Sequence, residues 1–144
     1  MTGWGRTLFE SAKAAEAAFY RAFEIKDLEA MMGVWASDTT IVCIHPMGPR
    51  LTGYQDIRDS WAAVFQGDGP MQFAITDVEV FETDTLAVRV VYENIGFAGD
   101  QRSLVLATNV YRLREDGWRM SLHHGSPGRL VAAPMPSAQD GTLH

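Results

Sequence analysis

Residues 26–61, KDLEAMMGVWASDTTIVCIHPMGPRLTGYQDIRDSW, hold the pattern that decides the fold. Asp27 is placed to cap a short helix whose apolar stripe consists of Leu28, Met31, Met32 and Trp35. A β-branched strand over residues 39–45 follows, and proline and glycine then turn the chain. A further helix is expected from about Tyr54 to Phe65, with the apolar stripe Ile57, Trp61, Val64 and Phe65. Helices and a sheet are therefore expected to share one core.

The residues before this stretch predict a longer helix. Thr7-Leu8-Phe9-Glu10 has the Thr-x-x-Glu spacing of a capping box, so the helix is expected to run from there to about Ile25. Its buried stripe is predicted to be Leu8, Ala12, Ala15, Phe19 and Phe23.

After Met71 the period of the sequence changes to two, which is typical of strands. A change of phase along the first strand predicts a β-bulge near Thr76 or Asp77. One face of the next strand is predicted to carry Leu86, Val88, Val90, Tyr92 and Asn94. A strand over residues 102–114 then meets an Asp116-Gly117 hairpin turn. A two-residue turn there pairs Leu113 with Met120, Tyr111 with Leu122, and Asn109 with His124.

The composition is that of one globular domain, which we expect over residues 1–130, followed by a proline- and alanine-rich tail over 131–144. A net charge of −6 and scattered basic residues argue against a nucleic-acid partner. No apolar run is long enough for a signal peptide or a membrane span, so a soluble, cytoplasmic protein is expected. Cys43 is the only cysteine, and we expect it to be a small buried hydrophobe.

From Thr7 to Gly128 the chain resembles the nuclear transport factor 2-like superfamily. The resemblance rests on residues 26–61, which look like the signature of its SnoaL-like branch, and on GWRMSLHHGSP at residues 117–127. It implies an α+β, cystatin-like cone in which a long N-terminal helix and two further helices pack on a curved, mainly antiparallel sheet. This fold serves isomerases, cyclases, dehydratases, hydrolases and proteins that only bind.

The ketosteroid isomerases of this superfamily supply a comparison residue by residue. Their catalytic strand ends in Asp-Pro where this chain has His45-Pro46, so the resemblance implies that His45 is the general base. It places Asn109 at their protonated oxyanion-hole aspartate and Phe19 at their oxyanion-hole tyrosine. An asparagine still donates a hydrogen bond, whereas a phenylalanine does not.

The predicted ligand-lining residues are His124, Tyr92, Asn94, Phe19, Trp35 and Trp61. The alternative for Asn109 and His124 is a mutually bonded pair inside the sheet, and for the two tryptophans it is plain core. His123 and His124 point to opposite faces of a strand, so they cannot bind one metal together. No metal or cofactor is predicted, although a site built from His45, His124 and a carboxylate stays open.

Three functions remain open: an enzyme that acts on a small hydrophobic carbonyl compound, a domain that only binds such a molecule, and a structural dimer module. A homodimer is expected because the strand over 102–114 is apolar on both faces. The stripe that faces away from Asn109 consists of Leu104, Leu106, Thr108 and Val110.

Overall fold

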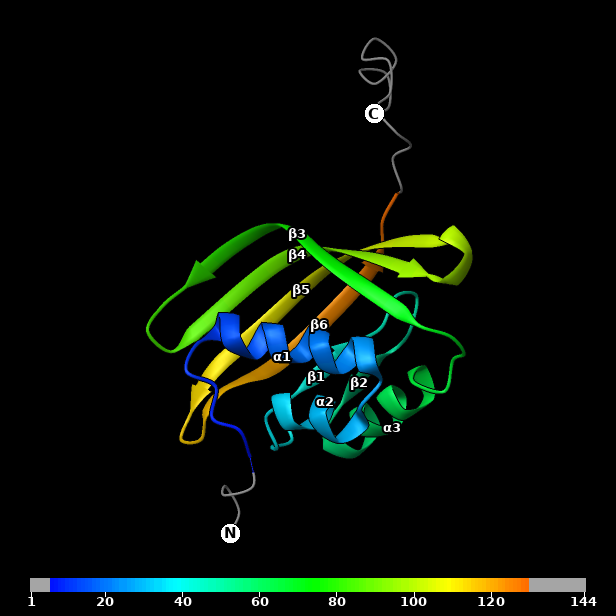
Figure 1. The fold of residues 1–144 in the computed structure, drawn as a ribbon. Helices are drawn as coiled ribbons and strands as arrows, with labels where there is room; N and C mark the ends of the chain where they lie inside the picture. Colours follow the sequence, from blue (N-terminus) through cyan, green and yellow to red (C-terminus); the bar gives the residue numbers. More distant parts are fainter. Residues whose placement is uncertain (1–5, 130–144) are drawn as a thin grey trace.

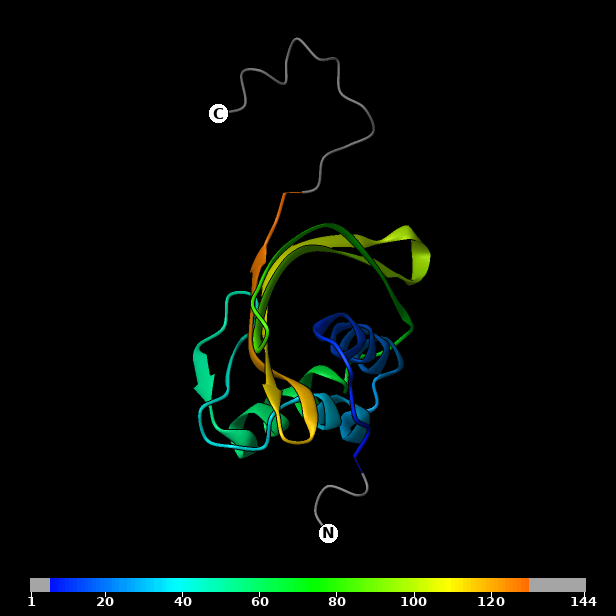
Figure 2. The ribbon, with the colours of Figure 1, turned by 90° about the vertical axis from the view of Figure 1, so that its left-hand side faces the viewer.

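The computed structural model describes residues 6–129, and they form helices packed on one six-stranded sheet. The elements are α1 (Ala12–Ile25), α2 (Leu28–Val34), β1 (Val42–Ile44), β2 (Arg50–Thr52), α3 (Tyr54–Val64), β3 (Met71–Glu82), β4 (Leu86–Phe97), the short 3₁₀-helix η1 (Ala98–Asp100), β5 (Arg102–Arg114) and β6 (Gly117–Pro127). The strand order is β2-β1-β6-β5-β4-β3, and every pair is antiparallel except β1 with β6. Helix α1 crosses the inner side of the sheet (Figure 1), which curves around it (Figure 2). The predicted α+β cone is confirmed.

The first helix begins later than the capping-box pattern indicates. Ser11 is the N-cap of α1, and its side chain accepts a hydrogen bond from the Ala14 amide at 3.0 Å. The box predicted at Thr7 is therefore wrong, and Leu8 is 60% exposed rather than part of the buried stripe. The expected cap of the second helix is confirmed, since Asp27 accepts from the Ala30 amide at 3.0 Å.

Strand β1 ends at Ile44, directly before His45 and Pro46, as expected for a proline that cannot extend a ladder. The turn predicted after it also contains the short strand β2, which pairs with β1 and was not expected from so many prolines and glycines. In β3 the predicted bulge is confirmed: the register shifts between Thr76 and Glu79, and Asp77 has a φ of 52°.

The β5–β6 hairpin has a different register from the one predicted. Arg114 pairs with Gly117, so the turn consists of Glu115 and Asp116, and Gly117 adopts a φ of 101° close to the N-terminal segment. Tyr111 pairs with Met120 and Val110 with Leu122, which leaves Ser121 without a partner as a bulge. This bulge changes the phase of β6.

The consequence of that bulge is that His123, not His124, faces inward. His123 is buried opposite Asn109, whereas His124 is exposed opposite Thr108. The predicted pairing of Asn109 with His124 is wrong, because a one-residue slip moves every following side chain to the other face.

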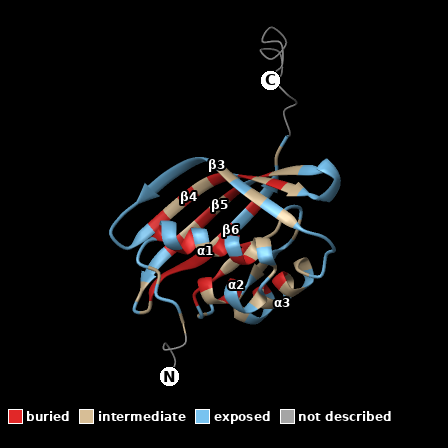
Figure 3. Ribbon diagram, in the orientation of Figure 1, coloured by how far each residue is buried: buried red, intermediate tan, exposed pale blue. Residues whose placement is uncertain are grey.

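The predicted inner face of β4 is also wrong. Tyr92 is 40% exposed and Asn94 is half-buried, both on the outer side of the sheet. The inner residues of β4 are Ala87, Arg89, Val91, Glu93 and Ile95, all of them buried. Figure 3 shows the buried residues where the helices cover the sheet and exposed residues along β3 at its edge.

The tail predicted over 131–144 lies outside the described residues. Within residues 6–129, no helix is both long and apolar enough to cross a membrane.

Candidate functional site

His45 lies where strand β1 ends, on the inner side with the buried residues Ile41 and Cys43, as the alternation predicts. Its Nε2 is 2.9 Å from the hydroxyl of Ser60, on α3. That hydroxyl donates to the carbonyl of Ile57 at 2.7 Å, so it accepts from His45, and Nε2 carries the hydrogen. No partner for Nδ1 occurs among the described residues.

Burial lowers the pKa of the half-buried His45, so the imidazole is neutral at neutral pH and Nδ1 holds a free lone pair. The Cys43 sulfur lies 3.6 Å from His45 Nε2, but burial raises the pKa of this thiol to about 12. Cys43 is therefore an inert, buried thiol and not a nucleophile.

Aromatic rings enclose the inner side of His45. The Trp61 ring centroid is 4.7 Å from that of His45, nearly perpendicular to it, and the His123 ring is 6.5 Å away. Phe19 contacts both Trp61 and His123, with centroids 5.6 and 5.0 Å apart. The predicted residues Phe19 and Trp61 are thus brought together beside His45.

Asn109 is fully buried and belongs to a chain of hydrogen bonds through the cone. His123 Nδ1 lies 2.6 Å from the Asn109 carbonyl oxygen, the Asn109 amide donates to the Tyr20 hydroxyl at 3.0 Å, and Tyr20 donates to Glu93 at 2.6 Å. The remaining amide hydrogen points to Glu16 at 3.5 Å. Both donor positions of Asn109 are therefore occupied within the protein.

Charged side chains cross the same interior. Glu16, on α1, accepts from Arg89 Nε at 2.9 Å, and the Tyr111 hydroxyl lies 3.5 Å from the same carboxylate. Arg89 offsets the charge of Glu16, so of the two buried carboxyl groups in this network Glu93 is the one with no cation against it.

Burial is the main cause of the pKa shifts in this network. It raises the pKa of Glu93 to about 7, against the opposing effect of the Tyr20 hydrogen bond, and nearby Glu16 raises it further. It lowers the pKa of His123 to about 3, with smaller contributions from His45 and His124. His123 is therefore neutral and donates Nδ1–H to Asn109.

The other predicted ligand-lining residues lie elsewhere. His124, Tyr92 and Asn94 lie on the outer side of the sheet, where Asn94 donates to the Ala74 carbonyl and the Thr76 hydroxyl, both at 3.0 Å. Trp35 is fully buried in the main hydrophobic core, and its backbone forms an isolated parallel bridge with Met120 of β6. Within residues 6–129, no three His, Cys, Asp or Glu side chains are grouped to hold a metal ion.

The sequence reasoning missed Glu16, Tyr20, Ser60, Arg89, Glu93 and His123. Glu16 lies within the stripe formed by Ala12, Ala15 and Phe19. A charged residue inside a predicted buried stripe is a signal from which its buried role could have been predicted. Arg89 and Glu93 share one face of β4, but both faces of that strand carry apolar residues, and the sequence reasoning took the other face to be the inner one.

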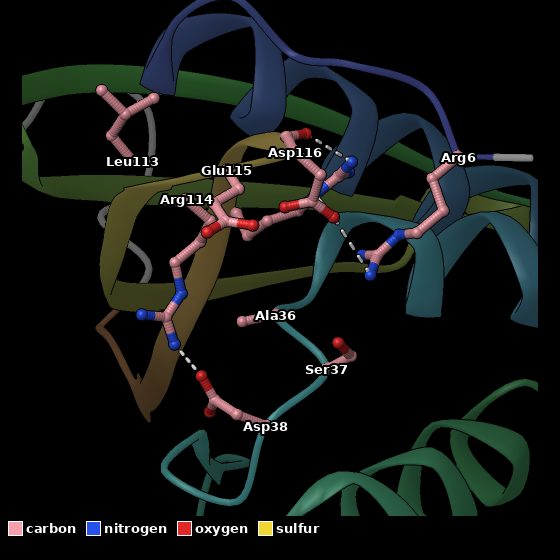
Figure 4. A pocket seen from close by; sticks show the side chains of 9 residues that line it. Arg6, Ala36, Ser37, Asp38, Leu113, Arg114, Glu115 and Asp116 are labelled. Carbon is pink, nitrogen blue, oxygen red and sulfur yellow. Dashed lines mark hydrogen bonds and ion pairs between the residues drawn. The ribbon is translucent and has the colours of Figure 1, made fainter. Parts of the chain in front are cut away.

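Three surface hollows lie apart from this network. One of about 800 Å³ lies under the β5–β6 turn, where Arg114 pairs with Asp38 and Arg6 lies 3.4 Å from Asp116 (Figure 4). A second of about 890 Å³ lies against α1 and α2, and a third of about 500 Å³ has Tyr92 and Asn94 in its wall. None of the three reaches His45 or Asn109, so a cavity shared by these two residues stays a prediction.

Comparison with known proteins agrees with the observed fold. The model of the SnoaL-like domain family matches residues 12–129, which include every member of the polar network. The chain belongs to the SnoaL-like domain family. This chain is similar to a solved structure from Thiobacillus denitrificans, which is a proposed calcium/calmodulin-dependent protein kinase type II association domain. The two share 39% identity, with a TM-score of 0.81, over 86% of this chain and 100% of the other.

A second solved relative is a proposed dehydratase of the NTF2-like family from Streptomyces avermitilis. It shares 32% identity with this SnoaL-like domain, with a TM-score of 0.73, over 82% of this chain and 94% of that one. The F-box protein SKIP8 of Arabidopsis thaliana is 25% identical over 108 residues, which are 75% of this chain and 46% of the plant protein. The chain thus spans less than half the length of that relative.

Proposed function

We propose that this SnoaL-like domain is an enzyme that binds a small, largely apolar carbonyl compound and moves a proton on it, as isomerases, cyclases and hydratases do. The observation that carries the proposal is the neutral His45 imidazole, whose Nε2 is fixed by Ser60 and whose Nδ1 has no partner among the described residues. A general base needs a free lone pair in a position held by its neighbours.

The apolar part of the ligand would lie against the rings beside His45. Phe19 and Trp61 supply this wall, and aromatic surfaces with a few polar groups are typical of small-molecule sites. The predicted oxyanion role of Asn109 requires that a ligand oxygen displace the Tyr20 hydroxyl from its amide. Without a ligand, the hydrogen bonds of Asn109 hold His123 and Tyr20 in place.

The relative named as a proposed dehydratase supports this class of chemistry. Dehydration of a β-hydroxy carbonyl compound begins with removal of the proton next to the carbonyl and ends with loss of the hydroxyl group as water. Isomerisation begins with the same proton transfer, so one base at the position of His45 serves both reactions.

Hydrogen exchange at carbon tests the proposal without knowledge of the natural substrate. Cyclohexanone in D₂O should exchange the protons next to its carbonyl faster in the presence of the protein, as followed by ¹H NMR. His45→Gln should lower the catalysed rate by about 10²-fold, whereas His124→Gln, on the outer side, should not change it. The rate should fall as pH falls through the lowered pKa of His45. Binding without catalysed exchange would favour a domain that only binds.

A second candidate function is assembly into a homodimer through the outer face of the sheet. Cross-strand rows of apolar residues cover this face: Phe81, Val88, Val110 and Leu122 in one row, and Tyr92 and Leu106 in another. Leu106 is 37% exposed, and an exposed apolar face of this kind is typical of association surfaces. The relative named as a proposed association domain supports this candidate.

A further inference from the structure

The indole N–H of Trp61 has no hydrogen-bond acceptor among the described residues, although the side chain is fully buried. A buried donor without a partner destabilises the folded state, so such groups are rare and call for an explanation. The ring contacts Phe19, Phe23, Phe65, His45 and His123. The free donor therefore belongs to a residue that packs directly against the candidate base.

The N–H and O–H groups around His45, other than that of Trp61, already have acceptors. His45 Nε2–H is directed at Ser60, and the Ser60 hydroxyl donates to the Ile57 carbonyl. The Asn109 amide donates to Tyr20, and Tyr20 donates to Glu93. Of these groups, only Trp61 could bind a new oxygen atom without breaking a bond that the structure shows.

We propose that the Trp61 indole N–H is the donor that binds the carbonyl oxygen of the ligand, a specificity-determining contact beside His45. The inference rests on the proposed function for the chemical class of the ligand, a small carbonyl compound. It deepens that function by naming the residue that binds the carbonyl oxygen. The Trp61 and His45 rings are nearly perpendicular with centroids 4.7 Å apart, so the unpartnered donor and the free Nδ1 of His45 belong to side chains in direct contact. The surrounding phenylalanine rings fit the apolar remainder of the ligand.

The indole signals in a ¹H–¹⁵N NMR spectrum test the contact directly. Trp61→Phe and Trp35→Phe assign the two relevant signals among the four tryptophans. Cyclohexanone should move the Trp61 signal downfield, whereas methylenecyclohexane, which has a CH₂ group in place of the oxygen, should not. Trp35 is a matched control, because its indole N–H is also buried without a partner among residues 6–129.

The affinity for cyclohexanone gives a second measurement. Loss of one neutral hydrogen bond should weaken binding about tenfold. The variants are Trp61→Phe and, should the smaller ring disturb folding, replacement of Trp61 by β-(3-benzothienyl)alanine, which keeps the shape and lacks the N–H. Binding of methylenecyclohexane to the benzothienyl variant should equal that to the wild type.

An unmoved Trp61 signal at saturating cyclohexanone, equal affinity with and without the N–H, or no binding of cyclohexanone at all would each overturn the inference. The proposed catalysis fails separately: a shifted Trp61 signal without catalysed deuterium exchange would refute the enzyme and leave the Trp61 contact intact.

Discussion

Replacement of Glu93 by glutamine should remove a large part of the pH dependence of folding stability. Glu93 is 2% exposed, and its pKa rises from 4.5 to about 7 in the folded protein. At pH values below 4.5 the Glu93 carboxyl group is neutral in both the folded and the unfolded chain, so it does not lower the free energy of unfolding. Above 7 it is ionised in both, and the folded protein then holds a buried charge. The stability present at low pH is therefore lost as pH rises through this window.

The size of the loss follows from the width of the window. At about 1.36 kcal/mol per pH unit, the interval from 4.5 to about 7 corresponds to about 3 kcal/mol in the free energy of unfolding. Glutamine is neutral at every pH and keeps an oxygen that can accept the hydrogen bond from Tyr20. Glu93→Gln should thus match the wild type at low pH and exceed its stability by about 3 kcal/mol at high pH.

Urea unfolding at about pH 4 and about pH 8 measures both free energies. Glu79→Gln, an exposed carboxylate on the neighbouring strand, is the control and should keep the pH dependence of the wild type. If Glu93→Gln and the wild type lose the same stability between the two pH values, Glu93 is not buried as a titrating group and the reasoning is refuted.

Three further substitutions test other parts of the structure. Asn109→Ala should lower the free energy of unfolding by about 1–3 kcal/mol for each buried partner left unsatisfied, as measured in urea, whereas Thr108→Ala on the outer side should change little. Arg119→Met removes donors to three backbone carbonyls and should destabilise by about 3–5 kcal/mol in the same assay, with the exposed Arg112→Met as control. Leu106→Lys should convert the proposed homodimer to a monomer in light scattering, and a monomeric wild type at micromolar concentration would contradict that proposal.

Much of the fold was predictable because local signals and tertiary structure agree. Asp27 caps α2, Pro46 follows the end of β1, and the change of phase after Ile75 marks the bulge in β3. Each of these signals acts within a few residues. His45 was placed correctly for the same reason, since its side depends only on alternation along one short strand.

The interior of the site was less predictable because it depends on register. An unpaired Ser121 reverses the phase of β6, and no local pattern marks that residue as a bulge. In β4 both faces carry apolar residues, so the inner position of Arg89 and Glu93 depends on Glu16 and Tyr20 of α1, far away in sequence. Charges enter the core here because their partners come from another element.

The two groups of polar residues in the cone differ in whether they leave hydrogen-bond donors or acceptors without a partner. From His123 through Asn109 and Tyr20 to Glu93, each donor has an acceptor, so this chain chiefly sets the stability of the fold and its response to pH. Tyr20, one position beyond Phe19 on α1, brings a hydroxyl into the cone, but Glu93 already accepts its hydrogen. Two groups beside this chain have no hydrogen-bond partner among the described residues: the Nδ1 lone pair of His45 at the end of β1 and the indole N–H of Trp61 on α3. A ligand that offers an acceptor to the indole and a hydrogen to the imidazole would satisfy both groups without breaking the interior network.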